Sequence, residues 1–266
     1  GRLRGWIERR YYEAQGRRIL FGCDAALCVS QKLKEVLIAR YRVPPEKAER
    51  MHVLPTLASR KEFVFDPAAR ARIRDENGWG DRYLVIYSGN LRGAWQVPDK
   101  LVEAFVMIRT RRPDAFFLVL TPDADRHHIE THLRRLGVPP DLWHIRSSPH
   151  GEIVNYLCAA DVGLLLRDRH PMNEAASPGK FGEYTLSGLP LILTDGIGDF
   201  SLHVRECALA CVLPDLSDPD TLRERIQRFC ARDFKPEERQ AFSRWAGDRF
   251  AIETMVPKLA ALYRSV

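Results

Sequence analysis

Residues 84–93 read LVIYSGNLRG, an apolar run followed directly by a glycine-containing turn. The apolar run is typical of a buried strand, and the turn marks its end. Residues 99–111 follow with the apolar spacing of an amphipathic helix, and residues 115–120 form another apolar run. A strand, a helix and a second strand in this order predict a right-handed crossover between two parallel strands.

The same alternation continues from this unit towards the C-terminus, over about 130 residues in all. It predicts a doubly wound α/β sheet, in which ligands bind at the carboxyl ends of the strands. The further predicted strands cover residues 142–145, 162–166, 189–193 and 212–213, and the further predicted helices cover residues 129–136, 151–160, 181–187, 202–206, 218–231, 237–249 and 252–264.

The residues before this region predict a shorter set of elements. Residues 25–29 and 51–54 are expected to be strands, separated by a helix that Ser30 caps and that runs to residue 40. Residues 56–67 have no clear period and are expected to be a linker. Residues 2–20 predict a helix with an arginine-rich face, for which we favour a solvated surface helix over one whose basic face rests on anionic membrane.

Composition limits the classes of function. The chain has 266 residues, 45% of them apolar, and a net charge of +6. No apolar run approaches the roughly 18 residues that a membrane span needs. The positive charge suits anionic partners such as nucleotide diphosphates, whereas no nucleic-acid-binding signature appears, so no nucleic-acid partner is expected. The six cysteines form no CxxC pair, and Cys23, Cys28 and Cys158 are interpreted as buried free thiols. A reducing cytoplasm fits this interpretation, with contact at the inner face of the cell membrane as the alternative location.

The most specific segment is NEAASPGKFGEYTLSGLP at residues 173–190. Ser177 and Pro178 are expected to open a helix, whose first N–H groups suit an anion. Lys180 falls in the first turn, where the helix dipole disfavours a cation unless a phosphate is bound. Glu183 follows one turn later and could accept hydrogen bonds from both hydroxyls of a ribose. An ordinary helix with a solvent-facing Lys180 and Glu183 is the alternative.

Two other loops follow predicted strands. In residues 88–93, Gly89 and Gly93 allow a ligand close to the backbone, and Arg92 could add charge. Residues 194–199, with two glycines between two acids, could bind a sugar, a metal or nothing, and we favour a simple turn.

The chain as a whole resembles the group 1 retaining glycosyltransferases of the GT-B fold, and more narrowly the bacterial members that act in cell-surface polysaccharide synthesis. The motifs that carry the resemblance are, in order, CDAALCVS (residues 23–30), VLP (53–55), YSG (87–89), WQ (95–96), AADVGL (159–164), the segment 177–190 and GIGD (196–199).

The resemblance implies two Rossmann-like domains with a cleft between them. Residues 1–57 would be the last part of the N-terminal, acceptor-side domain, residues 58–80 an interdomain linker, and residues 81–243 the nucleotide-sugar-binding domain. Residues 244–266 would form a helix that returns towards the N-terminal domain. The acceptor loop and the active-site histidine of the family are expected before Gly1. On its own the chain is therefore expected to bind donor but transfer sugar poorly.

The resemblance also implies metal-independent transfer with retention, from a UDP- or GDP-type sugar as donor substrate and with no other cofactor, to a glycan or lipid-linked acceptor. Lys180 and Arg92 would stabilise the charge on the leaving diphosphate. Glu183 would bind the ribose hydroxyls, while Arg146 and Ser147 would meet the base. The remaining expected donor-binding residues are Ser88, Gly89, Asn90, Ala176, Ser177, Pro178, Gly179 and Phe181.

The sequence departs from the family at several positions. Ala175 stands where the family has a glutamate that contacts the donor sugar, and Asn90 stands where it has an arginine. No histidine matches the active-site one, and all are expected at the surface. Two alternatives stay open: an epimerase of the same fold that acts on a nucleotide sugar, and a non-catalytic module that binds a nucleotide or a partner protein. The histidines are His52, His127, His128, His132, His144, His150, His170 and His203.

Overall fold

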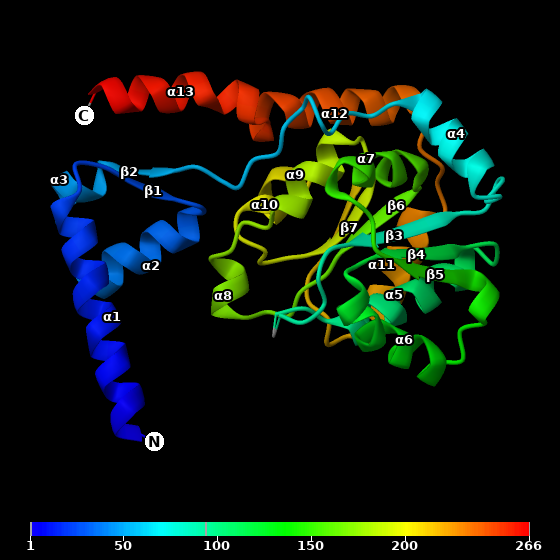
Figure 1. Ribbon diagram of the computed structural model, residues 1–266, viewed down its shortest axis with the longest axis horizontal. Coiled ribbons are helices and arrows are strands. Elements are labelled where there is room, and N and C mark those ends of the chain that lie inside the picture. Colours follow the sequence, from blue (N-terminus) through cyan, green and yellow to red (C-terminus); the bar gives the residue numbers. More distant parts are fainter. Residues whose placement is uncertain (1, 94, 266) are drawn as a thin grey trace.

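The computed structural model describes residues 2–93 and 95–265, which form a small and a large lobe joined by two segments (Figure 1). Both ends of the described chain lie at the small lobe. The small lobe contains α1 (Arg2–Gly22), β1 (Ala26–Cys28), α2 (Gln31–Tyr41), α3 (Pro45–Ala48) and β2 (Met51–Val53).

The large lobe is built on a six-stranded parallel sheet of order β5-β4-β3-β6-β7-β8. In chain order this is third, second, first, fourth, fifth and sixth, so the order reverses between β3 and β6, as in a doubly wound sheet. The predicted fold class is therefore confirmed. The strands are β3 (Leu84–Ser88), β4 (Phe116–Leu120), β5 (Trp143–Arg146), β6 (Val162–Leu165), β7 (Leu191–Thr194) and β8 (Ala210–Leu213).

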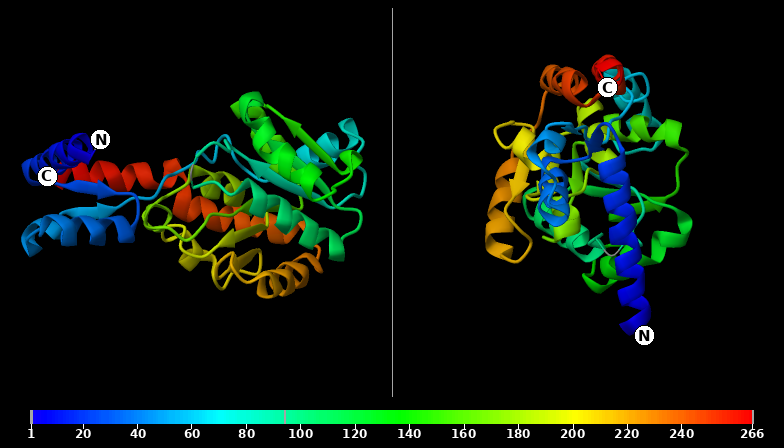
Figure 2. Two further views of the ribbon diagram at one scale, coloured as in Figure 1. Left: turned by 90° about the horizontal axis from the view of Figure 1, so that it is seen from below. Right: turned by 90° about the vertical axis from the view of Figure 1, so that its left-hand side faces the viewer.

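Helices cover both faces of this sheet (Figures 1 and 2). One face packs against α5 (Pro98–Arg111), α6 (Arg126–Arg135) and α11 (Pro219–Cys230). The other packs against α4 (Pro67–Glu76), α7 (His150–Ala159), α9 (Gly179–Leu186), α10 (Phe200–Val204) and α12 (Pro236–Phe250). Three short helical turns, η1 (Asp123–Asp125), η2 (Pro140–Leu142) and α8 (Pro171–Glu174), lie in the loops.

Helix α4 lies within residues 58–80, where the sequence indicated a linker. Asp66 caps it by accepting a hydrogen bond from the Ala68 N–H. Two of its arginines fasten it to the end of α7: Arg70 and Arg74 both donate to the Ala159 carbonyl, at 2.6 and 2.8 Å, and both pair with Asp161. Besides the buried Ala69 and Ile73, long-range polar contacts thus hold the helix, and apolar periodicity in the sequence does not reveal such contacts.

Two segments cross between the lobes side by side. The Ala58 N–H donates to the Phe250 carbonyl at 3.1 Å, and the Ile252 N–H donates to the Ala58 carbonyl at 3.0 Å. From Ile252, α13 (Ile252–Ser265) runs along the small lobe. The two crossings are therefore joined by backbone hydrogen bonds at Ala58.

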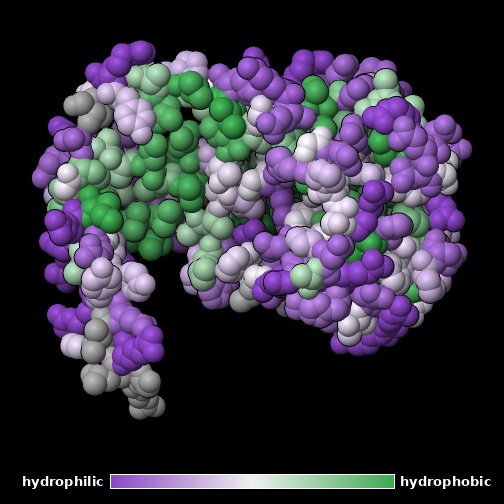
Figure 3. Space-filling model, viewed as in Figure 1, coloured by the Kyte–Doolittle hydropathy of each residue, from purple (hydrophilic) through white to green (hydrophobic). Residues whose placement is uncertain are grey.

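The small lobe holds a two-stranded parallel sheet with an apolar face open to solvent. Cys28 and Met51 pack with α2 on one side, whereas Leu27, Val29 and Val53 are each about 40% exposed. Figure 3 shows apolar residues gathered over this lobe. Across the described residues, no helix combines the length and the apolar character required to traverse a bilayer.

Candidate functional site

The loops after β3 and β6 meet where the strand order reverses, and α9 brings Lys180 between them. The Lys180 ammonium donates a hydrogen bond to the Tyr87 hydroxyl at 2.8 Å and lies over the Tyr87 ring, 4.2 Å from its centroid. Gly89 has a φ of +136°, and a Cβ there would overlap the end of the Lys180 side chain. A glycine at position 89 is therefore what allows Lys180 to reach Tyr87.

Lys180 and Glu183 lie one turn apart on α9 and both have shifted pKa values. Burial and, to a smaller extent, the charge of Arg167 lower the pKa of Lys180 to about 7, and Glu183 opposes the shift. Burial raises the pKa of Glu183, against the effect of His150 and Lys180. The environment therefore disfavours the charged form of both side chains. Ionisable groups with such shifted pKa values are common at ligand-binding sites.

The shifted pKa of Lys180 predicts a pH-dependent stability. Between pH 7 and about 10 the unfolded chain binds a proton at this lysine and the folded chain does not, so folding is favoured more as the pH rises. Relative to Lys180→Met, the free energy of unfolding of the wild type should increase by up to about 1.4 kcal/mol per pH unit in this window. Urea unfolding of both proteins at pH 7, 8 and 9 measures the difference. If the difference in the free energy of unfolding between the two proteins did not change with pH, Lys180 would stay protonated beside Tyr87, Arg167 and Glu183.

Helix α9 begins without a side-chain cap. Pro178 is its N-cap residue, and the Ser177 hydroxyl accepts a hydrogen bond from the Thr56 N–H at 2.7 Å instead of capping the helix. A Cβ on Gly179 would lie 3.8 Å from a Glu183 carboxylate oxygen and 3.5 Å from Thr56. The structure therefore brings Gly179, Lys180 and Glu183 together at the start of α9, and places Ser177 against the interlobe segment.

Phe181 was expected among the donor-binding residues, and the structure places its side chain in the core. The side chain is fully buried and stacks on Phe200, with ring centroids 4.0 Å apart, and it meets Phe250 edge-on. The ring therefore anchors α9 to the core, and a role of Phe181 in donor binding stays a prediction.

The loop after β3 also differs from expectation, because its polar groups already have partners. The Gly89 N–H donates to the Leu120 carbonyl at 2.8 Å, so this amide does not point into an open anion cradle. The Ser88 N–H donates to the Tyr184 hydroxyl at 2.8 Å, and the Asn90 carbonyl accepts from the Tyr87 hydroxyl at 2.8 Å. In the loop that was expected to let a ligand approach the backbone, these groups are therefore engaged within the protein.

Arg92 was expected to supply positive charge, but the structure pairs it. Its side chain, 59% exposed, forms an ion pair with the buried Asp125, which also accepts the Leu91 N–H at 3.0 Å. The pair fastens the loop after β3 to η1.

Arg146 and Ser147 lie at the carboxyl end of β5. The Arg146 carbonyl accepts the Thr121 N–H at 3.0 Å, and its guanidinium lies over the Tyr156 ring. The Arg146 carbonyl is thus already engaged, whereas Ser147 is exposed.

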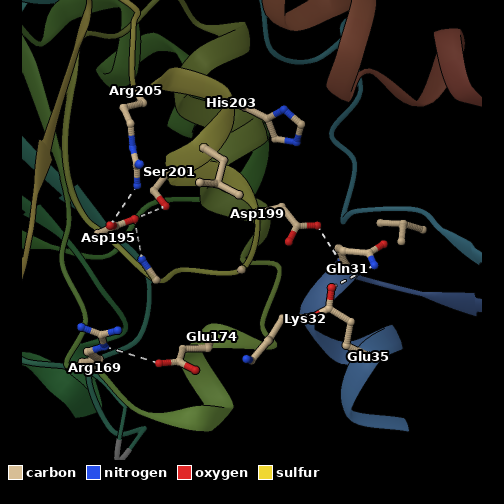
Figure 4. A pocket seen from close by; sticks show the side chains of 14 residues that line it. Gln31, Lys32, Glu35, Arg169, Glu174, Asp195, Asp199, Ser201, His203 and Arg205 are labelled. Atoms are coloured by element: carbon tan, nitrogen blue, oxygen red, sulfur yellow. Dashed lines mark hydrogen bonds and ion pairs between the residues drawn. The ribbon is translucent and has the colours of Figure 1, made fainter. Parts of the chain in front are cut away.

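A pocket of about 680 Å³ lies between the lobes, close to this site (Figure 4). Asp199 points across it and accepts the Gln31 N–H of α2 at 2.7 Å, while the Ser30 hydroxyl donates to the Ala175 carbonyl at 3.0 Å. On the far wall, Asp195 is held by Ser201 and Arg205. Residues 194–199, interpreted as a simple turn, therefore connect the two lobes. No pattern in the sequence of residues 194–199 predicts their contact with α2.

Within residues 2–93 and 95–265, no group of three or more histidine, cysteine, aspartate or glutamate side chains is placed to hold a metal ion.

Comparison with known proteins places this geometry in a structural class. No family model and no curated protein matches the sequence. Among solved structures, sucrose-phosphate synthase from Thermosynechococcus elongatus aligns with a TM-score of 0.70 and 20% identity, over 94% of this chain and 60% of that one. WaaG, a glycosyltransferase involved in lipopolysaccharide biosynthesis, aligns with a TM-score of 0.65 and 18% identity, over 88% of this chain and 61% of that one.

HepE from Anabaena, solved in complex with UDP and glucose, aligns with a TM-score of 0.69 and 16% identity, over 92% of this chain and 64% of that one. These neighbours are GT-B glycosyltransferases, and at such identities the likeness shows the fold: a complete C-terminal parallel-sheet domain with part of a second. The chain spans 60–64% of the length of these three neighbours.

Proposed function

We propose that this chain, which has the fold of the GT-B glycosyltransferases, is the donor-binding part of a glycosyltransferase. Its donor would be a UDP- or GDP-type nucleotide sugar, with no other cofactor. Transfer would retain the anomeric configuration and would deliver the sugar to a glycan or lipid-linked acceptor in bacterial cell-surface polysaccharide synthesis. We place it in the cytoplasm, with contact at the inner face of the membrane.

The observation that carries this proposal is that Lys180 and Glu183 lie one turn apart on α9, at the edge of the sheet where the strand order reverses. A diphosphate at the uncapped start of α9 would meet the Lys180 ammonium and the first N–H groups of the helix. A ribose one turn further would meet the Glu183 carboxylate. The HepE structure, which contains UDP and glucose, supports a UDP-type donor.

The chemistry follows from the charge at this site. The bond between the sugar and the diphosphate breaks and negative charge gathers on the departing diphosphate. The oxygen of an acceptor hydroxyl then bonds to the anomeric carbon, and the hydroxyl proton passes to the departing diphosphate. Fixed cationic and N–H groups that face the departing charge lower the barrier most. Binding of an anion would favour the charged form of Lys180, whose pKa is lowered to about 7 in the free protein.

Calorimetric titration tests the proposal. UDP, GDP, ADP and UDP-sugars are titrated into the wild type, Glu183→Ala and the control Glu152→Ala, which removes an exposed acid from the first turn of α7. We expect one diphosphate to bind, and Glu183→Ala to weaken it at least about tenfold, or 1.4 kcal/mol, with Glu152→Ala unchanged. A folded wild type that binds none of these nucleotides would exclude the donor site.

Ala175 favours a second candidate, a module that binds a nucleotide without turnover. The family's sugar-contacting glutamate is absent at this position, and the Ala175 carbonyl instead accepts a hydrogen bond from Ser30 of the small lobe. Binding of UDP without release of sugar from a UDP-sugar, with or without added acceptors, would support this candidate.

A further inference from the structure

Arg167 follows β6 directly and lies at the same reversal of the sheet as Tyr87 and Lys180. Its backbone is fixed on both sides by the Thr194 hydroxyl, which accepts the Arg167 N–H at 3.0 Å and donates to the Arg167 carbonyl at 2.9 Å. The side chain is 9% exposed. A charged residue is therefore held rigidly inside the protein at the edge where ligands bind in such sheets.

The guanidinium of Arg167 lacks a compensating charge. Its Nε is buried and has no hydrogen-bond partner, and an Nη donates to the Asn173 side-chain oxygen over a long 3.4 Å. Within residues 2–93 and 95–265, no carboxylate lies within 4 Å of it. Its charge is close enough to Lys180 to lower the pKa of that lysine, so the two cations repel each other.

Among the residues whose exposure the structure describes, the other buried arginine has a hydrogen-bond partner for each nitrogen of its guanidinium group. Arg239, 3% exposed, donates to the carbonyls of Gly188, Ala160 and Leu157. A buried cation without such partners lowers stability. An anion that contacted both Arg167 and Lys180 would compensate the two charges.

We propose that Arg167 binds a phosphate of the nucleotide diphosphate together with Lys180. This inference rests on the proposed function and adds a binding residue to it. The guanidinium can donate two parallel hydrogen bonds to one phosphate, which an ammonium cannot. Because Arg92 is paired with Asp125, Arg167 supplies the positive charge that Arg92 was expected to give.

The test compares UDP with inorganic pyrophosphate as calorimetric probes. Arg167→Met removes the charge at similar length, Arg167→Lys retains it, and Arg134→Met is a control on α6 at an exposed arginine paired with Glu130. We expect Arg167→Met to weaken both probes about 10- to 100-fold, Arg167→Lys to recover part of the loss, and Arg134→Met to change neither. Glu183→Ala should weaken UDP but leave pyrophosphate unchanged.

Thermal unfolding without ligand separates binding from support of the fold. Arg167→Met should melt at the same temperature as the wild type or higher, because an unpaired buried charge has been removed. Wild-type and Arg167→Met proteins that bind both probes equally would overturn the role of Arg167 and leave the proposed function standing. Pyrophosphate binding that depends on Arg167, without nucleotide binding, would keep the anion site and exclude the donor function. A folded wild type that binds neither probe would exclude both.

Discussion

Replacing Phe181 with alanine is expected to lower the free energy of unfolding by about 3–5 kcal/mol. The ring is fully buried, stacks on Phe200 and meets Phe250 edge-on, so its removal leaves a cavity between α9, α10 and α12. Elements from three parts of the chain enclose this cavity, which limits how far it can collapse. The loss should therefore approach the upper end of the range.

Urea unfolding measures this loss, with Leu136→Ala as the control. Leu136 is 41% exposed at the end of α6, and its truncation should cost less than about 1 kcal/mol. Phe181→Met, which keeps most of the volume, should fall between the two. Unchanged stability together with lost nucleotide binding would return Phe181 to the ligand site.

Gly198→Ala is expected to destabilise the protein by about 2–5 kcal/mol and to disturb the candidate site. Gly198 has a φ of +50°, and a Cβ there would overlap the Ala176 carbonyl and approach Ser30 at 3.7 Å. The Gly198 N–H also donates to the Asn173 carbonyl at 3.0 Å, so residues 173–176 must shift with it. The left-handed conformation and the overlap each contribute to the loss.

Gly80→Ala is a matched control for this substitution. Gly80 has the same φ of +50°, but a Cβ there meets nothing within 4 Å. It should lose only the roughly 1–2 kcal/mol of the left-handed conformation and should bind UDP like the wild type. Equal losses from the two variants in urea unfolding, with equal UDP affinity, would show that residues 173–176 do not depend on the close approach at Gly198.

The order of strands and helices in the large lobe could be predicted from the sequence because each buried strand is a compact apolar run. The α9 segment with Lys180 and Glu183 could also be located, since Pro178 and the glycines mark its start and end. The roles proposed for Lys180 and Glu183 stay predictions that the titrations address.

The other site residues depend on partners far along the chain. The burial of the Phe181 ring could not be predicted, because Phe200 and Phe250 decide which side of α9 is buried. Arg92 and the Gly89 N–H are occupied by Asp125 and Leu120, which no local pattern connects to them. The sequence analysis missed Arg167, because what distinguishes this arginine is a buried Nε without a hydrogen-bond partner among the described residues. Only the three-dimensional structure shows this.

The backbone bridge at Ala58 and Ala251 gives the large lobe the topology of an inserted loop. The chain leaves the small lobe and returns to it at the same point. The two ends of the segment 58–251 are therefore held together by the hydrogen bonds of this bridge. The lobes therefore share one pivot and not two independent tethers. A rotation of the lobes about Ala58 that widened the pocket would break the hydrogen bond between Gln31 and Asp199, and it would act two residues from the Thr56 N–H that contacts Ser177 before α9.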